Sequence, residues 1–324
     1  MRRECCDMRV LTLEEVIYEK FLEEGKVVTF DGKTNPSEGW IVVMAGGSGA
    51  GKGFVLKTLV PISGKKLDPD QLKPYMIKKG SAITDNIIKF NDGSEINLED
   101  RGIYPPYDLS NPDFVRLIHE HPLTKRLKKA QKDTLYKSVA SSDSRRRPNI
   151  IFDMTLDELS KLENIISTYK PMGYKIAVVY VFTPIDVAIE QNEKRTRTVP
   201  KDILLEIHRN VYKTLPKLLS SPEIESNVDD IWIVQQLKVD TEDRYDVLKY
   251  IEANNVTRLE KGADGLRELE DELADFVKQQ LKRIRQIEDE MSEEESRQEM
   301  LRNENLETAR FGVILEGGKL ESLF

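Results

Sequence analysis

The 324-residue sequence is poor in cysteine and has no long apolar segment. Its only two cysteines, Cys5 and Cys6, are adjacent, and this spacing suits neither a disulfide framework nor a zinc site. No apolar run approaches the roughly 20 residues of a membrane-spanning helix, so we expect no membrane segment. The N-terminus lacks the apolar stretch of a signal peptide. We therefore expect a cytoplasmic protein.

Charged residues, by contrast, are abundant. The 57 acidic residues outnumber the 49 Lys and Arg residues, which gives a formal net charge of −8 at pH 7. This balance argues against broad coating of nucleic acid, although a local basic cleft can still bind phosphates. The length and the 39% hydrophobic content favour one large domain with appendages.

An apolar segment at residues 41–45 runs into a glycine-rich loop, and a helical pattern follows at residues 54–59. This order of strand, loop and helix is what a phosphate-binding P-loop needs, and Gly46, Gly51 and Lys52 satisfy the pattern GxxxxGK. The glycines let successive backbone N–H groups point at phosphates, and Lys52 adds a charge at the β- and γ-phosphates. We predict that this loop binds ATP or GTP. The predicted nucleotide-binding residues are Gly46, Gly47, Ser48, Gly49, Ala50, Gly51, Lys52 and Gly53.

The residue after Lys52 departs from the P-loop pattern. Gly53 stands where a serine or threonine normally ligates magnesium. Two interpretations are open. In the first, Mg²⁺ is held through water and other groups, of which Ser48 and Asp153 are the candidates. In the second, the site binds nucleotide but catalyses poorly.

Carboxylates follow two further segments. Asp68 and Asp70 end a short segment at the position where the second strand of P-loop kinases faces the transfer site. Asp70 is the candidate base that accepts a proton from a substrate hydroxyl, and a simple turn with a helix cap is the alternative. Asp153 ends an apolar run, which predicts a carboxylate at the carboxyl edge of a parallel strand, where it would contact magnesium through water or bind an acceptor hydroxyl.

Two arginines, Arg195 and Arg197, follow a helical segment at residues 185–194. Arginines spaced in this way resemble a lid whose guanidinium groups close on a transferred phosphoryl group. An exposed basic turn is the alternative interpretation.

Strands and helices alternate along most of the chain, which predicts an α/β fold of the P-loop NTPase class. Its sheet is predicted to be doubly wound and mainly parallel, with flanking helices and an α-helical C-terminal extension. We expect an N-terminal helix and hairpin (residues 1–39) packed on a kinase domain (residues 40–240), with an irregular insertion near residues 79–111. A charged helical extension is expected at residues 241–324.

The C-terminal extension carries apolar residues at spacings of three and four within residues 262–309, which predicts a long amphipathic helix. We expect a packed arm or a helical hairpin. A homo-oligomer formed by a coiled coil at residues 266–291 is the weaker alternative, because the heptad slips between Phe276 and Leu281.

The order of these features resembles the zeta toxin group of P-loop kinases, to which chloramphenicol phosphotransferase is also similar. The resemblance covers roughly residues 40–234. It rests on the loop at residues 46–52, the pair Asp68 and Asp70, residues 152–155 where the family tends to have Glu-Gly-Thr, the Gly173-Tyr174 entry to an apolar strand, and residues 197–201. The departures from the family pattern are Gly53 and the shorter side chain of Asp153.

The resemblance implies roles for individual residues. Lys52 would bind phosphate, Asp70 would activate a hydroxyl with Asp68 beside it, and Arg197 would stabilise the transferred phosphate with Arg195 as a second arginine. The resemblance also implies that Asp153 and Thr155 contact the acceptor, and it makes an antitoxin-like protein partner an expectation, since one is usual for the toxin branch.

We therefore expect a kinase that transfers the γ-phosphoryl group of ATP or GTP, with Mg²⁺, to a hydroxyl of a small-molecule acceptor such as a nucleotide sugar or a nucleotide. One alternative is a polynucleotide 5′-hydroxyl kinase, which would use a basic groove and would be the only version that binds nucleic acid. That groove would be formed by Lys125, Arg126, Lys128, Lys129 and residues 145–147. The other alternative, suggested by Gly53 and the long helix, is a nucleotide-gated binding or assembly protein with little catalysis.

Overall fold

The computed structural model describes residues 28–33, 35–68, 73–74, 77, 83–90, 92–107, 109, 111–140, 147–195, 197–235, 255–259 and 265–318. The chain divides into two compact units, Met1–Val277 and Lys278–Phe324. Several predictions lie outside the described residues: the N-terminal helix, Asp70, Arg145 and Arg146, and the domain boundary after residue 240.

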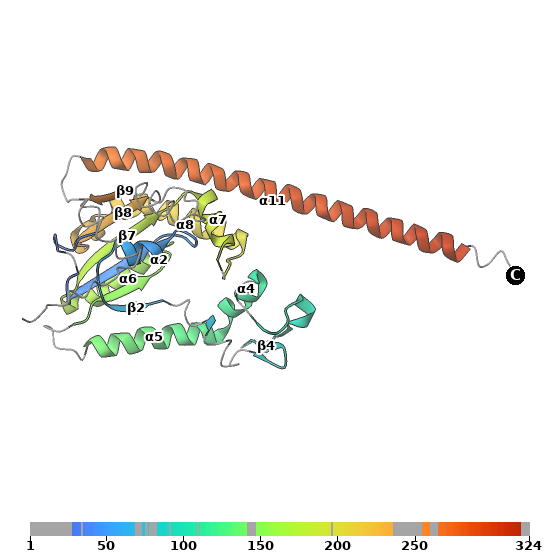
Figure 1. Ribbon diagram of the computed structural model, residues 1–324, viewed down its shortest axis with the longest axis horizontal. Coiled ribbons are helices and arrows are strands. Elements are labelled where there is room, and N and C mark those ends of the chain that lie inside the picture. The colour runs from blue at the N-terminus through green and yellow to red at the C-terminus, as the bar shows by residue number, and fades with distance from the viewer. Residues whose placement is uncertain are drawn as a thin grey trace, which may run out of the picture. The chain divides into compact units, whose positions relative to one another are not determined.

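The first unit is built on a six-stranded sheet in the order β2-β6-β1-β7-β8-β9 (Figure 1). Neighbouring strands pair in parallel, except that β9 runs antiparallel to β8. The strands are β1 (Trp40–Ala45), β2 (Lys65–Leu67), β6 (Ile150–Asp153), β7 (Lys175–Phe182), β8 (Asp230–Gln235) and β9 (Asn255–Leu259). From β1 the chain first forms β2 and β6 on one side and then β7 and β8 on the other side, so the sheet is doubly wound, as predicted.

Helices cover both faces of this sheet, which explains why its strands are apolar on both sides. Along β1, Ile41 and Val43 are buried in one cluster with residues of α6 and α8, whereas Val42 and Met44 are buried in a second cluster with residues of α2. The helices are α2 (Lys52–Thr58), α4 (Pro112–Glu120), α5 (Pro122–Ala140), α6 (Ser160–Tyr169), α7 (Ile185–Glu193), α8 (Lys201–Ser220), α9 (Pro222–Asn227) and α11 (Gly265–Gly318). Short 3₁₀ helices occur at η2 (Glu99–Arg101) and η3 (Lys170–Met172).

The register of the strands brings chemically active residues to one edge of the sheet. Met44 pairs with Asp153 across β1 and β6, and Leu67 pairs with Phe152 across β2 and β6. Asp68, Asp153 and the loop after β1 therefore share the carboxyl edge, where ligands bind in open α/β sheets.

A buried asparagine ties three segments together at the opposite edge. Asn149 is 1% exposed, and its Oδ1 accepts a hydrogen bond of 2.9 Å from the backbone N–H of Trp40. Its Nδ2 donates to the carbonyl oxygens of Pro36, at 2.6 Å, and Ser63, at 3.0 Å.

Replacing Asn149 by alanine is expected to lower the free energy of unfolding by about 3 kcal/mol or more, because each buried polar group left without a partner costs about 1–3 kcal/mol. Chemical denaturation would measure the change. Asn97→Ala is the control, because the Asn97 side chain accepts one exposed hydrogen bond from the backbone of Glu99. A loss at Asn149 no larger than the loss at Asn97 would contradict this account.

The segment predicted to be irregular forms a small antiparallel sheet of β3 (Ile83–Thr84), β4 (Ile87–Lys89) and β5 (Glu95–Asn97). Its hairpin turn lies near Gly93, whose N–H donates to the carbonyl of Phe90 at 3.1 Å. Ile88 and Phe114 belong to a separate hydrophobic cluster that this sheet shares with α4. The prediction of irregular structure is therefore wrong here, because strands of two or three residues are too short to show a periodic pattern.

The C-terminal helix α11 is continuous over its 54 residues, so the predicted long helix is confirmed and the helical hairpin is wrong. Within the first unit, Leu273 is buried and the ring of Phe276 lies 3.9 Å from that of Phe182, centroid to centroid. The second unit continues the helix, with an ion pair of 3.4 Å between Arg297 and Glu294. No helix in the described ranges is long and apolar enough to cross a membrane.

Candidate functional site

A cavity of about 1360 Å³ lies at the carboxyl edge of the sheet. Its walls come from the loop after β1, the ends of β2 and β6, helices α4, α5 and α6, and the segment between α7 and α8. Of the residues predicted from the sequence, the lining includes Gly47, Ser48, Gly49, Ala50, Gly51, Lys52, Gly53, Asp68, Asp153, Thr155, Arg195 and Arg197. Gly46 is not part of the lining, and Asp70 is outside the described residues.

Three glycines of the loop, Gly46, Gly49 and Gly51, have positive φ angles, and a side chain at the first two would also meet close backbone atoms. Gly46 and Gly49 have φ angles of +138° and +76°, which L side chains rarely adopt. A Cβ atom at Gly46 would lie 2.5 Å from the carbonyl oxygen of Val181, and one at Gly49 would lie 2.3 Å from that of Ala188. The loop is thus packed tightly on β7 and α7, with its polar backbone available to the cavity.

Lys52 opens α2 and reaches back across the loop. Its Nζ donates hydrogen bonds to the carbonyl oxygens of Gly46, at 2.8 Å, and Gly47, at 3.0 Å. The ammonium group is therefore held over the loop, where the phosphate chain of a nucleotide would lie in a P-loop.

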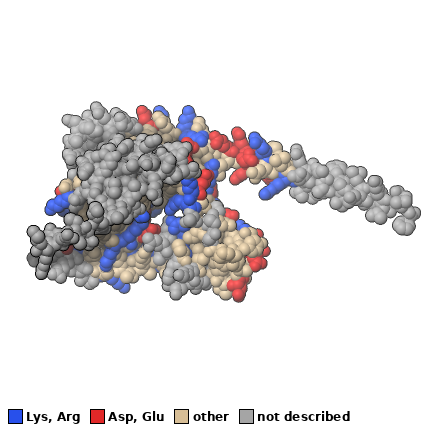
Figure 2. All heavy atoms as spheres, viewed as in Figure 1, with Lys and Arg blue, Asp and Glu red and all other residues tan. Residues whose placement is uncertain are grey.

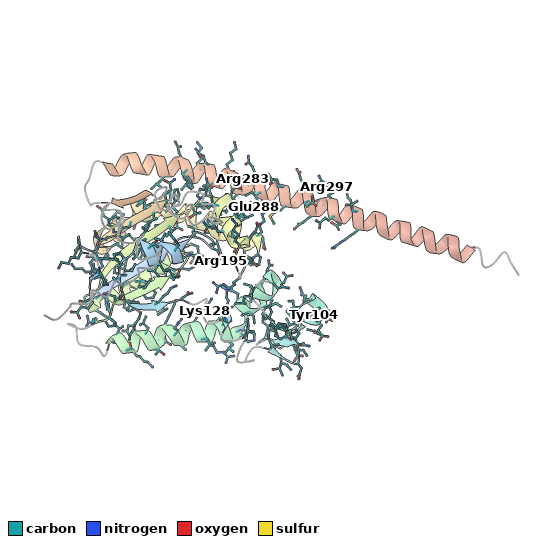
Figure 3. The ribbon with its side chains drawn as sticks, in the orientation of Figure 1. Tyr104, Lys128, Arg195, Arg283, Glu288 and Arg297 are labelled. Carbon is teal, nitrogen blue, oxygen red and sulfur yellow. The ribbon has the colours of Figure 1, made fainter. Side chains whose placement is uncertain are left out.

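The two predicted lid arginines lie on the segment between α7 and α8. Asn192 closes the base of this segment: its Nδ2 donates to the Val199 carbonyl at 2.8 Å, and its Oδ1 accepts from the Val199 N–H at 2.9 Å. Arg195 reaches the glycine loop, with its Nη1 donating to Ser48 Oγ at 3.3 Å. Figure 3 shows Arg195 on this segment and Lys128 on α5, on the two sides of the opening.

A lysine connects the two carboxylates at the ends of β2 and β6. Lys66 Nζ lies 3.0 Å from Asp153 Oδ2 and 3.3 Å from Asp68 Oδ2. Burial alone would lower the pKa of Lys66, but the hydrogen bonds and charges of Asp153 and Asp68 raise it above its usual value. Lys66 is therefore a cation at neutral pH, and it lies between Asp68 and Asp153, two of the predicted site residues.

The loop after β6 orients the hydroxyl of Thr155. Thr155 Oγ1 donates to Asp157 Oδ1 at 2.6 Å, and Lys161 pairs with the same carboxylate. Burial acts to raise the pKa of Asp157, but the hydrogen bonds from Lys161 and Thr155 outweigh it and lower the pKa below its usual value. Since the Thr155 hydroxyl donates its hydrogen bond to Asp157, a ligand in the cavity meets the lone pairs of that hydroxyl oxygen.

Several residues that build the site were missed by the sequence analysis. Asp157 continues the alternation of Asp153 and Thr155, and Lys66 lies two residues before Asp68, so both carried a signal in the sequence. Lys161 and Asn192 carried none, because their roles depend on partners that only the fold supplies.

The cavity has the opposite charge balance to the whole chain. Its cations are Lys52, Lys66, Lys73, Arg116, Lys128, Lys132, Lys161, Lys194, Arg195 and Arg197. Its acids are Asp68, Glu120, Asp133, Asp153, Asp157, Glu190 and Glu206. Figure 2 shows Lys and Arg side chains bordering the opening near the centre of the view. In a chain with a net charge of −8, this local excess of cations favours an anionic ligand.

The order of the parallel strands, the glycine loop with its lysine, and the acids at neighbouring strand ends define a P-loop kinase-like fold. The family model for the zeta toxin matches residues 118–251, which confirms the expected resemblance to this family over less than half of the chain. The matched segment contains Asp153, Thr155, Arg195 and Arg197, whereas the glycine loop precedes it. No curated protein matches the chain.

Solved structures with similar folds include a chain of AvrRxo1-ORF1:-ORF2 with ATP and a chain of the PezAT chromosomal toxin–antitoxin system of Streptococcus pneumoniae. The first is 11% identical, with a TM-score of 0.42, and the alignment covers 75% of this chain and 60% of that chain. The second is 14% identical, with a TM-score of 0.38 and coverage of 83% and 97%. Because both TM-scores are low, the fold assignment rests on the strand order and glycine loop described above.

Proposed function

We propose that this chain is a kinase that transfers the γ-phosphoryl group of ATP or GTP to a hydroxyl of a small-molecule acceptor, such as a nucleotide sugar or a nucleotide. The proposal rests on one observation. The glycine loop, Asp68, Asp153, Thr155 and the two lid arginines all line the same cavity. A phosphoryl donor and an acceptor must meet in one site, and phosphoryl transfer depends mainly on positioning and charge stabilisation.

In the proposed reaction, the acceptor oxygen forms a bond to the γ-phosphorus while the bond to the β–γ bridging oxygen breaks, and the nucleoside diphosphate leaves. The hydroxyl proton passes to a carboxylate, for which Asp70 is the candidate. Lys52 and the loop N–H groups hold the phosphates, and Arg195 and Arg197 balance the charge of the transferred group. Asp153 and Thr155 orient the acceptor hydroxyl.

A magnesium ion, bound with the nucleotide, would supply further charge neutralisation. The residues near the loop fit such an ion: Ser48 Oγ and the Asp153 carboxylate are hard oxygen donors in the cavity lining. Gly53 opens toward the same cavity, and a Cβ atom at this position would meet no heavy atom within 4 Å. Packing therefore does not require glycine at position 53.

Replacing Gly53 by serine is expected to strengthen nucleotide binding in the presence of Mg²⁺ about tenfold, because it restores the hydroxyl that P-loops use as a magnesium ligand. Titration calorimetry with ATP, with Mg²⁺ and with EDTA, would measure the effect. Gly53→Ala is the matched control, since it adds a Cβ atom without a ligand. An equal gain in both variants, or a gain that persists in EDTA, would contradict a magnesium contact at this position.

The experiment that tests the proposed function is phosphoryl transfer from labelled ATP and GTP, with Mg²⁺, to a panel of acceptors. The panel holds uridine-diphosphate sugars, nucleosides, nucleotides and a 5′-hydroxyl oligonucleotide. A labelled product that is absent with the Lys52→Ala variant supports the kinase and names its acceptor class. Nucleotide binding without product on any acceptor would overturn it.

One observation favours a polynucleotide 5′-hydroxyl kinase as the second candidate. Lys128 and Lys132, one helical turn apart on α5, line the cavity and would lie along a nucleic-acid backbone. This candidate requires product on the oligonucleotide, and Lys128→Ala with Lys132→Ala would then weaken its binding in a salt-dependent manner.

The remaining candidates concern partners. Gly53 and the long helix α11 suggest a nucleotide-gated assembly, which requires oligomerisation through residues 266–291 that depends on nucleotide. Size-exclusion chromatography with light scattering, with and without ATP, distinguishes it from a monomeric kinase. The resemblance to the zeta toxin family supports an antitoxin-like protein partner as a further proposal.

A further inference from the structure

A buried histidine packs against the glycine loop from the side of α8. His208 is 1% exposed, and its Nε2 lies 2.7 Å from the carbonyl oxygen of Ser48. A carbonyl oxygen can only accept, so Nε2 carries the proton and donates it. The other ring nitrogen, Nδ1, is then an acceptor, and it is buried without a hydrogen-bond partner in the part of the chain that the structure describes. Among the described residues, the hydrogen bond to Ser48 is therefore the only hydrogen bond of this buried ring.

The ring is neutral under physiological conditions. The pKa of His208 is lowered to about 4, mainly because the ring is buried; the hydrogen bond to Ser48 acts to raise it and the charge of Lys52 acts to lower it. A neutral ring with one protonated nitrogen keeps a single tautomer, so the direction of the donated hydrogen bond is fixed.

The same ring fills the space beside Gly47. A Cβ atom on Gly47 would lie 2.3 Å from both Cε1 and Nε2 of His208. Unlike Gly46 and Gly49, Gly47 has no positive φ angle, so its backbone would tolerate an L side chain. The requirement for glycine at position 47 therefore comes from the contact with His208.

The carbonyl groups of the loop show what this contact contributes. When the loop N–H groups turn toward phosphates, the carbonyl oxygens need other partners. Lys52 bonds those of Gly46 and Gly47, and a phosphate would compete for its ammonium group. The Ser48 carbonyl is held by His208, and the Ala50 carbonyl by Thr183 Oγ1 at 3.1 Å. Neither His208 nor Thr183 lines the cavity, so a bound nucleotide would not compete for these two contacts.

We propose that His208 is a positioning residue for the nucleotide phosphates, which sets the conformation of Gly47 and Ser48 by one hydrogen bond and one packing contact. His208 would not touch the nucleotide itself. The proposal rests on the proposed binding of nucleotide by the loop, and it predicts that changes at His208 raise the Kd and KM for ATP without changing the KM for the acceptor.

The test compares His208→Gln with His208→Met in the full chain. Gln keeps an N–H donor at a similar distance from the backbone, whereas Met has a similar length and no donor. We expect His208→Met to bind ATP roughly 10- to 100-fold more weakly in titration calorimetry, because it removes the donor to the Ser48 carbonyl, and His208→Gln to recover most of the affinity. Equal ATP affinities in wild type and both variants would overturn the proposal, and so would equal losses in both variants with unchanged melting temperatures.

The packing contact has its own test, which also decides the matter if His208→Met does not fold. Gly47→Ala should weaken ATP binding about tenfold or more, since overpacking forces the loop to shift. Adding His208→Ala in the same chain removes the clash and should restore part of the affinity. A double variant that binds no better than Gly47→Ala would overturn the packing role. Product formation is measured separately, so a chain that binds ATP but transfers nothing would refute the kinase and leave this comparison valid.

Discussion

Replacing Lys52 by alanine is expected to abolish detectable phosphoryl transfer, a loss of roughly 10³-fold or more, because it removes a preorganised cation from the site where phosphate charge develops. Lys52 Nζ already lies within hydrogen-bonding distance of the Gly46 and Gly47 carbonyls, so its position over the loop is set by the fold. Nucleotide affinity should fall as well, since in the proposed function the same charge would contact the bound phosphates.

The matched control for Lys52 is Lys57→Ala. Lys57 is an exposed lysine in the last turn of the same helix, α2, so it tests the loss of a charge without the loss of a phosphate contact. Initial rates with labelled ATP and ATP affinities by calorimetry would be measured for both variants. Transfer by Lys52→Ala at more than a tenth of the wild-type rate would contradict the role of the loop as the phosphate site.

Replacing Asp70 by alanine is expected to slow transfer by about 10²- to 10⁴-fold, the usual contribution of a general base, while ATP affinity changes little. Two other carboxylates of the site, Asp68 and Asp153, both lie within 3.3 Å of Lys66. These ion pairs favour a role for both side chains in positioning the acceptor.

The comparison with Asp68→Asn and Asp153→Asn makes the assignment of the base testable. We expect Asp153→Asn to raise the KM for the acceptor more than it lowers kcat, and Asp68→Asn to have the smallest effect of the three. Rates and ATP affinities for the three variants, with melting temperatures to check folding, would be measured on the acceptor found in the panel. Normal turnover by Asp70→Ala would show that the base is another group, and the variant with the largest loss in kcat would then identify it.

The parts of the fold that could be predicted are those with a pattern inside one continuous stretch. The glycine loop lies between an apolar strand and a helix, and α11 shows its apolar spacing over many turns. The sheet of β3, β4 and β5 could not be predicted, because strands of two or three residues contain no full period. The absence of a hairpin in α11 was also not predictable, since helical periodicity does not show whether a helix is interrupted.

The sequence by itself determined which residue types stand at the ends of the strands: the glycine loop with Lys52 after β1, Asp68 after β2 and Asp153 at the end of β6. These patterns are local, because a parallel strand and the residue that ends it are neighbours in the chain. Only the tertiary structure decided what surrounds them. Lys66 is joined to Asp153 across two strands, and His208 reaches Ser48 from a helix 160 residues away, so neither contact follows from spacing along the chain.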